Sequence, residues 1–403
     1  MFEISVECSR CNKRYLPNKA LTTCKKCGGA LLFRYDLEEI TERISKEVLA
    51  RRKNSFWKFL EFLPLSSSKS IVSLGEPYTP VIKIPRKHSF GFNNVFVKDE
   101  GRLPTGTFKA RGMAVAVSKL KELGIKRIAI PSAGNAASAL AAYGGKAGME
   151  VYTFMPKNTP NAILKECILL GAKTYLVDGS ISHAAEIVEK LKKKYGLFNL
   201  STNKQPYRFE GYKALAFELT EQFNWNPPEN IIFPTGGGEG IIGLWKGFKE
   251  LKEIGWIDNI PRLILVQSSG CAPLVKAFEN NDSEVRESWK NAETIAAGLK
   301  VPKPYASYLI LKAIRETEGL ALAVSDGEII SSIKTFMKMG IYACPEAAAT
   351  LASLKRIADQ SLLDRSERIL LFVTGNLMKY FDVIEIERKA SMVTREICPY
   401  FLD

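Results

Sequence analysis

Histidine is almost absent from this 403-residue sequence, in which only His88 and His183 occur. Neither a histidine-based catalytic triad nor a histidine-rich metal site is therefore expected. The chain also lacks an apolar run of about 18 residues, and its first residues lack the basic and then apolar pattern of a secretion signal. We expect a cytoplasmic protein with no membrane partner.

No repeat or low-complexity segment is found, because the 29 glycines and 19 prolines are dispersed without a period. Hydrophobic residues make up 46% and charged residues 25% of the chain, which is typical of a globular protein. The length suffices for two packed domains and a small appendage.

The net charge is +14, which raises the question of nucleic acid or anionic small molecules as partners. The basic residues form short groups typical of solvated helix faces, and no nucleic-acid recognition motif accompanies them. We expect no nucleic-acid partner and instead a positive cleft for a small phosphorylated or carboxylated substrate. A nucleic-acid-binding protein with a silent cleft is the alternative, which retention on DNA in a salt-dependent manner would support.

Four cysteines form two CxxC pairs near the start of the chain: Cys8, Cys11, Cys24 and Cys27. This spacing predicts a zinc ribbon, in which each pair offers two thiolates to one tetrahedral ion of structural role. Two disulfides, or a ribbon that folds without metal, are the alternatives. The other four cysteines are scattered and are expected to be buried apolar side chains: Cys167, Cys271, Cys344 and Cys398.

From residue 95 onward, short β-branched runs alternate with amphipathic or alanine-rich segments, a pattern that predicts mostly parallel sheets covered by helices. Strands are predicted at residues 95–98, 127–130, 151–155, 174–177, 230–233, 262–266, 321–324 and 369–373. Helices are predicted at residues 108–123, 136–147, 181–195, 211–223, 240–254 and 346–359. Polar or glycine-rich loops follow three of the strands, at residues 132–135, 235–240 and 374–376, which predicts one shared cleft.

Lys109 is predicted in the first turn of a helix that Thr105 or Thr107 can cap. The positive end of a helix disfavours a cation, so the neutral amine that a nucleophile needs is favoured there. A solvent-exposed surface lysine is the alternative.

A glycine-rich loop precedes the helix predicted at residues 240–254, and its backbone N–H groups are suited to hold a phosphate. A flexible turn is the alternative. The loop does not match GxGxxG, so a dinucleotide is not expected.

These segments resemble the pyridoxal-phosphate (PLP) enzymes of the threonine synthase and tryptophan synthase β type, known as fold type II. The resemblance covers about residues 75–380 and rests on GEPYTP at 75–80, PTGTFKARG at 104–112, SAGN at 132–135 and TGGGEG at 235–240. Within the family, Asn203 with PYRFEG at 206–211, and the segments at 266–274 and 294–298, are most similar to threonine synthases.

The resemblance implies a role for each matching residue. Lys109 is the Schiff-base lysine, Asn135 the partner of the ring hydroxyl and Thr374 the partner of the pyridine nitrogen. The residues implied to hold the cofactor phosphate are Gly236, Gly237, Gly238, Glu239 and Gly240. The residues implied to bind the substrate are Ser132, Ala133, Gly134, Asn203 and Arg208.

We thus expect an α/β protein with two open, twisted, mostly parallel sheets of PLP fold type II and a small amino-terminal zinc ribbon. The expected divisions are a ribbon at 1–36, a helical linker at 37–75, a large cofactor domain at 76–112 and 206–390, and a small α/β domain at 113–205. The resemblance also implies a homodimer with a small anionic amino acid as substrate.

The implied activity is that of a PLP-dependent lyase that converts O-phospho-L-homoserine and water to L-threonine and phosphate. Two departures concern the substrate: Ala110 stands where threonine synthases usually carry aspartate, and residues 374–380 lack an expected glycine and aspartate. The alternative is a threonine or serine dehydratase, or another PLP-dependent β-replacement or elimination enzyme. A dehydratase needs no second anion site, whereas Arg208 indicates one.

Overall fold

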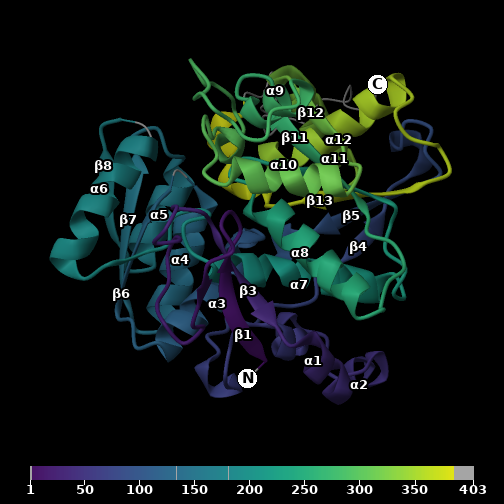
Figure 1. Ribbon diagram of the computed structural model, residues 1–403. Coiled ribbons are helices and arrows are strands. Elements are labelled where there is room, and N and C mark those ends of the chain that lie inside the picture. Colours follow the sequence, from purple (N-terminus) through teal and green to yellow (C-terminus); the bar gives the residue numbers. More distant parts are fainter. Residues whose placement is uncertain (1, 133, 180, 385–403) are drawn as a thin grey trace, which may run out of the picture.

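The computed structural model describes residues 2–132, 134–179 and 181–384. Its amino-terminal part is a small antiparallel sheet, in which β1 (Glu3–Cys8) pairs with β2 (Arg14–Tyr15) and β3 (Leu31–Tyr35). The short helices α1 (Leu37–Arg43) and α2 (Lys46–Ala50) follow, at the bottom of Figure 1. A 3₁₀ helix at Phe56–Phe62 comes next, so the segment predicted as a helical linker contains short helices up to residue 62.

The larger sheet has six strands in the order β12-β11-β10-β13-β5-β4. All neighbouring pairs are parallel except β4 with β5. The strands are β4 (Val81–Lys83), β5 (Asn94–Asp99), β10 (Asn230–Pro234), β11 (Arg262–Ser268), β12 (Ala321–Val324) and β13 (Arg368–Val373).

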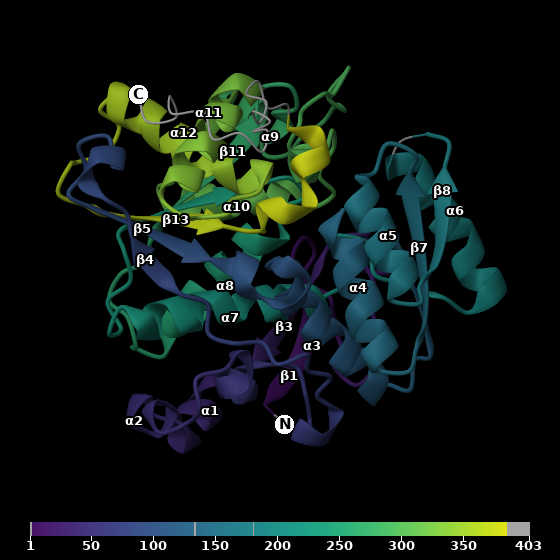
Figure 2. The ribbon, with the colours of Figure 1, turned by 180° about the vertical axis from the view of Figure 1, so that it is seen from behind.

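The smaller sheet is wholly parallel and has the order β8-β7-β6-β9. Its strands are β6 (Arg127–Pro131), β7 (Glu150–Pro156), β8 (Lys173–Val177) and β9 (Phe198–Asn199). In Figures 1 and 2 this sheet, with α4 (Asn135–Lys146), α5 (Asn161–Leu169) and α6 (Ile181–Tyr195), stands beside the body that holds the larger sheet.

Helices cover both faces of the larger sheet because its central strands are apolar on both sides. Ile231 and Phe233 of β10 belong to the core that includes α7 (Tyr207–Gln222) and α8 (Glu239–Glu253). Ile232, between them, faces α11 (Asp326–Lys338) and α12 (Pro345–Asp359). The remaining helices are α3 (Lys109–Glu122), α9 (Pro273–Glu279) and α10 (Ser307–Glu316). None of the helices in the described part of the chain is long and apolar enough to cross a bilayer.

All eight predicted strands are present, and the predicted α/β fold with parallel sheets is confirmed. The start of α7 was predicted wrongly: the helix begins at Tyr207, four residues before Gly211. A glycine occupies this position inside the helix because α3 passes very close to it. A Cβ atom on Gly211 would lie 2.2 Å from the carbonyl oxygen of Arg111, so only glycine fits.

Candidate active site

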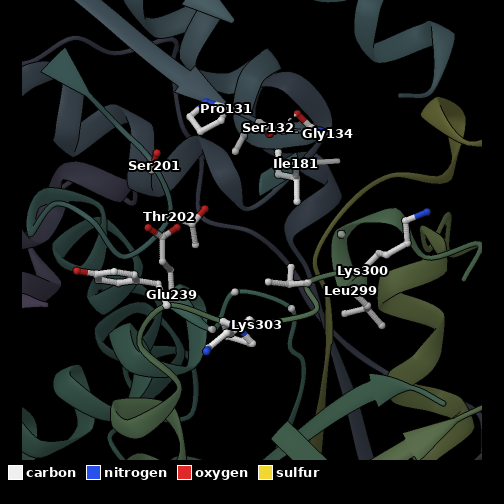
Figure 3. Close-up of a pocket in the computed structure, with 18 of the residues that line it drawn as sticks. Pro131, Ser132, Gly134, Ile181, Ser201, Thr202, Glu239, Leu299, Lys300 and Lys303 are labelled. Carbon is white, nitrogen blue, oxygen red and sulfur yellow. Dashed lines mark hydrogen bonds between the residues drawn. The ribbon is translucent and has the colours of Figure 1, made fainter. Parts of the chain in front are cut away.

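A cavity of about 970 Å³ opens where the carboxyl ends of strands from both sheets meet. Pro131 ends β6, Pro234 ends β10 and Thr374 follows β13, and all three residues line the cavity. Figure 3 shows Ser132 and Gly134 on one side and Glu239 and Lys303 on the other. The three polar loops that the sequence placed after strands therefore share one cavity, as predicted.

Lys109 is the first residue of α3 and lines the cavity. Its amine lies 4.4 Å from the ring centre of Phe108. Burial, and secondarily the positive charge of Arg208, lower the pKa of Lys109 to about 8. The arrangement thus favours the neutral amine that nucleophilic or general-base chemistry requires.

The predicted threonine cap of α3 is wrong, because no side chain caps this helix and Phe108 holds the N-cap position. The helix start is instead fixed to the segment after β13: Phe108 N–H donates to the Thr374 carbonyl at 2.9 Å, and Thr107 forms a β-bridge with Gly375. Thr107 therefore helps to hold Lys109 and Thr374 in the same part of the cavity.

The glycine-rich loop leads into α8, and several of its backbone N–H groups are free to donate hydrogen bonds. Within the described part of the chain, the backbone N–H groups of Gly236, Gly237 and Gly238 donate no hydrogen bond. Gly238 has φ of +84° and forms the N-cap of α8. A Cβ atom on Gly236 would lie 2.1 Å from the carbonyl oxygen of Gly298, so a side chain is excluded. Free N–H groups at the positive end of a 15-residue helix suit a phosphate.

Glu239 lines the cavity, but its carboxylate is engaged by protein groups. It accepts a hydrogen bond from the backbone N–H of Asn203 at 2.9 Å and forms an ion pair with Arg208 at 2.5 Å. Only backbone N–H groups of this loop are thus left for an anion.

Asn135 is the first residue of α4 and lines the same cavity as the glycine loop. Its amide NH₂ donates to the Tyr380 hydroxyl at 2.7 Å. Its amide oxygen is buried and has no hydrogen-bond partner within the described residues. A buried acceptor without a hydrogen-bond partner, on a residue that lines the same cavity as Lys109, is suited to a bound hydroxyl group.

The predicted substrate residues fall into two groups. Ser132 and Gly134 line the cavity, and Ala133 lies outside the described residues. Asn203 and Arg208 are fully buried and do not line it. The predicted helix start at residue 211 would leave Arg208 in the preceding loop, from which it could enter the cavity, and this expectation is wrong. It lies in the first turn of α7, where its guanidinium donates to the Leu200 carbonyl at 3.0 Å and pairs with Glu239.

Several residues that line the cavity were not predicted from the sequence. They include Arg10, Thr202, Lys204, Lys300, Lys303 and Tyr380. Neither Lys204 nor Lys300 forms a salt bridge among the residues that the structure covers, although Lys204 is near enough to Glu189 for its charge to act on that carboxylate. Both lie in irregular segments, where no periodicity indicates which way a side chain points.

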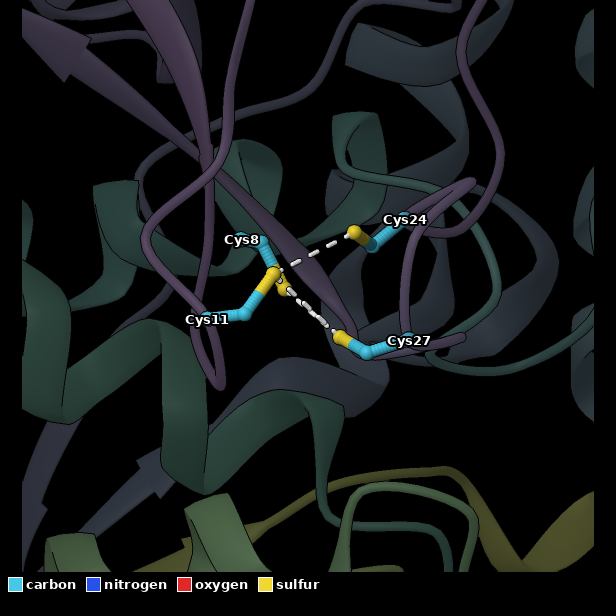
Figure 4. A group of neighbouring side chains, drawn as sticks. All are labelled: Cys8, Cys11, Cys24 and Cys27. Atoms are coloured by element: carbon cyan, nitrogen blue, oxygen red, sulfur yellow. Dashed lines mark hydrogen bonds between the residues drawn. The ribbon is translucent and has the colours of Figure 1, made fainter.

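The four cysteines of the amino-terminal module converge, as Figure 4 shows. Their sulfur atoms lie within 4.8 Å of one another, and the shortest separation, 3.4 Å, is found both between Cys8 and Cys27 and between Cys11 and Cys27. That separation exceeds the S–S bond length of about 2.05 Å, so the predicted alternative of two disulfides is not adopted. Burial alone would raise the pKa of Cys24, but hydrogen bonds from the Tyr15 hydroxyl and two backbone N–H groups lower it to about 6. Four convergent sulfurs fit a tetrahedral metal ion.

Known proteins resemble this chain in sequence and in fold. Residues 72–375 match the family described as "Pyridoxal-phosphate dependent enzyme". The chain is 36% identical over 375 residues to a threonine synthase of Methanocaldococcus jannaschii, with 92% of each chain covered. It is 33% identical over 377 residues to a threonine synthase of Methanosarcina acetivorans, covering 93% of this chain and 92% of the relative. Maize serine racemase shares the fold, with a TM-score of 0.66 and 21% identity over 75% of this chain and 88% of that chain.

Proposed function

The chain belongs to the family of pyridoxal-phosphate-dependent enzymes, and we propose that it converts O-phospho-L-homoserine and water to L-threonine and inorganic phosphate. The observation that carries this proposal is one cavity that combines a lysine of lowered pKa with an anion-binding loop and further basic side chains. The likeness over almost the whole chain to proteins named threonine synthase supports the choice of substrate.

The residues present fit pyridoxal phosphate. Lys109 would hold it covalently, the N–H groups of the glycine loop would bind its phosphate, and the orphaned Asn135 oxygen would accept its ring hydroxyl. Thr374 would offer a hydroxyl to the ring nitrogen, which leaves that nitrogen largely unprotonated. When bound, the cofactor supplies an electron sink that weakens the C–H bonds near the substrate amino group.

Lys109 acts in this proposal as the acid and base. A pKa near 8 leaves part of the amine neutral at pH 7, so Nζ can take the proton from the substrate Cα and carry protons at the neighbouring carbons. A ring nitrogen that meets the neutral hydroxyl group of Thr374 would stay unprotonated, and such a ring withdraws fewer electrons than one protonated beside a carboxylate. More of the control over the reaction would therefore fall on Lys109.

The two ends of the substrate need separate anion sites. We assign the α-carboxylate to the Ser132 loop, which opens onto the N-terminus of α4. We assign the phosphate to the basic side of the cavity, where Lys204 and Lys300 lie. Arg208 supports this arrangement indirectly, through its ion pair with Glu239 at the start of α8.

We also propose that Cys8, Cys11, Cys24 and Cys27 bind one structural Zn²⁺. Four sulfur ligands leave no open coordination position, so the ion would take no part in the reaction. The convergence of the four sulfur atoms supports this assignment. A cytoplasmic homodimer remains part of the proposal, and light scattering of the purified protein tests the dimer.

A threonine or serine dehydratase is the second candidate. The observation that favours it is Ala110, a fully buried neighbour of Lys109 at a position where threonine synthases usually carry aspartate. A dehydratase has no use for the unpaired lysines on the cavity wall, which argues for the phosphorylated substrate.

One experiment separates the two. Purified holoenzyme is incubated with O-phospho-L-homoserine, and threonine and phosphate are measured together. It is then incubated with L-threonine, and 2-oxobutanoate is measured. Equal amounts of threonine and phosphate support the proposed function, whereas 2-oxobutanoate without phosphate release would assign the dehydratase.

A further inference from the structure

The amino-terminal cysteine module touches the active-site cavity. Arg10 lies between Cys8 and Cys11 in the first CxxC pair, and its side chain lines the cavity. Its backbone N–H donates to the Cys8 sulfur at 3.4 Å, so the conformation of the cysteine cluster fixes the position of the Arg10 backbone. Among the described residues of this module (residues 2–36), Arg10 alone lines the cavity.

Arg10 in the first CxxC pair and Gly28 directly after the second contact the same part of the cavity, which we call the module-facing wall (residues 284–286 and 297–305). The Arg10 guanidinium forms an ion pair with Glu284 and lies 3.8 Å from the ring centre of Tyr308. After the second pair, the Gly28 carbonyl accepts a hydrogen bond from the Tyr305 hydroxyl.

Further hydrogen bonds fix the module beside this wall. The Tyr308 hydroxyl is 2.7 Å from Ser9 Oγ and accepts from the backbone N–H of Ala30 at 2.9 Å. Tyr308 lies in the first turn of α10, directly after the wall. The module thus contacts the wall at Glu284 and Tyr305, and it contacts Tyr308 directly after the wall.

The wall has little structure of its own to hold it in place. Between the end of α9 at Glu279 and the start of α10 at Ser307, the only regular element within the described residues is the three-residue turn Ala297–Leu299. A connection of this length keeps one conformation only through contacts with other parts of the protein. The wall also carries Lys300, and Tyr305 lies under the amine of Lys204 at 5.1 Å.

We infer that the cysteine module is a structural support for the substrate side of the active site, with Arg10 as the positioning residue that transmits its fold to the module-facing wall. The metal site would then affect substrate affinity, although the metal takes no part in the reaction. The link to phosphate binding rests on the proposed function, whereas the link to the order of the wall does not.

The test compares Arg10→Gln with Arg14→Gln in the holoenzyme. Arg14 is an exposed arginine of the same module that pairs with Glu7 and does not line the cavity. For Arg10→Gln we expect the KM for O-phospho-L-homoserine to rise about threefold to tenfold, the size expected for a partly exposed ion pair and the contacts it orders. The kcat and the visible absorbance of the bound cofactor should stay within about twofold, because Arg10 touches neither Lys109 nor the glycine loop.

The charge-reversed pair Arg10→Glu/Glu284→Arg separates positioning from direct contact. If Arg10 acts through Glu284, the reversed pair recovers the wild-type KM more fully than Arg10→Glu alone. If the KM of the reversed pair is as high as that of Arg10→Glu alone, Arg10 contacts the substrate itself and the positioning role is overturned.

Hydrogen exchange gives a readout that does not depend on turnover. Chelation of the metal, or Arg10→Gln, should speed exchange in peptides that span residues 284–305 by about fivefold or more, and leave α11 unchanged. Equal exchange in wild type, Arg10→Gln and Arg14→Gln would refute the support role. A wild-type enzyme that ignores O-phospho-L-homoserine would refute the proposed function instead, and the exchange data would still decide this inference.

Discussion

The guanidinium of Arg208 and the carboxylate of Glu239 form an ion pair at 2.5 Å in which neither side chain is exposed to solvent. Arg208 belongs to the first turn of α7, and Glu239 is the first residue of α8, directly after the glycine loop. The pair thus fixes the loop that we expect to bind the cofactor phosphate. The charge of Arg208 also acts on Lys109, whose pKa it helps to lower.

Replacing Arg208 by leucine should be strongly destabilising. It leaves the Glu239 carboxylate buried without its partner, which typically costs about 3–5 kcal/mol. The double variant Arg208→Leu/Glu239→Gln removes the unpaired charge and should regain part of that loss. Denaturant unfolding of the three proteins measures the free energies, and equal stability of both variants would mean that the pair is not energetically coupled.

Kinetics of a folded Arg208 variant separate the indirect role from direct recognition of the substrate phosphate. Support of the glycine loop predicts similar losses with O-phospho-L-homoserine and with threonine, together with weaker cofactor binding. A direct contact with the phosphate predicts a loss of roughly 30- to 1000-fold in kcat/KM on the phosphorylated substrate only. The burial of Arg208 behind Glu239 leads us to expect the first pattern.

Capture of pyridoxal phosphate by the cofactor-free protein should depend on pH through Lys109. Only the neutral amine reacts, so the rate should rise with pH, with a midpoint near the pKa of about 8, and level off above it. Arg208→Leu removes a positive charge that lowers this pKa, so the midpoint should move to higher pH. Stopped-flow absorbance measures both curves, and an unchanged midpoint would show that Arg208 does not act on Lys109.

The same shift affects stability with a defined sign. The pKa of Lys109 is lowered from 10.5 to about 8, so between these pH values the folded cofactor-free protein binds fewer protons than the unfolded chain. The contribution of Lys109 to the free energy of unfolding therefore rises with pH across this window. A Lys109→Met variant should lack this rise in denaturant unfolding experiments on the cofactor-free protein.

The strands and the shared cavity could be predicted from the sequence because their signals are local. Strands such as β10 and β11 are short apolar runs bounded by polar loops, and their carboxyl ends must meet at one edge of a parallel sheet. The start of α7 could not be predicted, because Gly211 resembles a helix boundary. Its real cause, the close approach of the Arg111 backbone, is a tertiary contact.

The missed site residues share this origin. Arg10 reaches the cavity only because the cysteine module packs against residues almost 300 positions later, such as Tyr308. Tyr380 contacts Asn135, from which 245 positions separate it along the chain.

Lys109→Ala should abolish the visible absorbance of the bound cofactor and the activity, while the fold is retained because alanine is a strong helix former. Lys204→Ala is the matched control, since Lys204 also lines the cavity but lies in an irregular segment away from the α3 start. It should keep the absorbance and lose affinity for the phosphorylated substrate. Absorbance spectra and borohydride reduction check both variants, and a reducible cofactor adduct in Lys109→Ala would place the attachment elsewhere.

The double variant Cys8→Ser/Cys24→Ser tests the metal site. Removing one ligand from each CxxC pair should release about one metal ion per chain, because two remaining thiolates bind Zn²⁺ weakly. Cofactor binding should persist, since none of the four cysteines lines the cavity. Cys167→Ser, at a buried cysteine outside the cluster, is the control and should keep its metal. Metal analysis by atomic absorption measures the outcome, and full retention in the double variant would refute a site made of four thiolates.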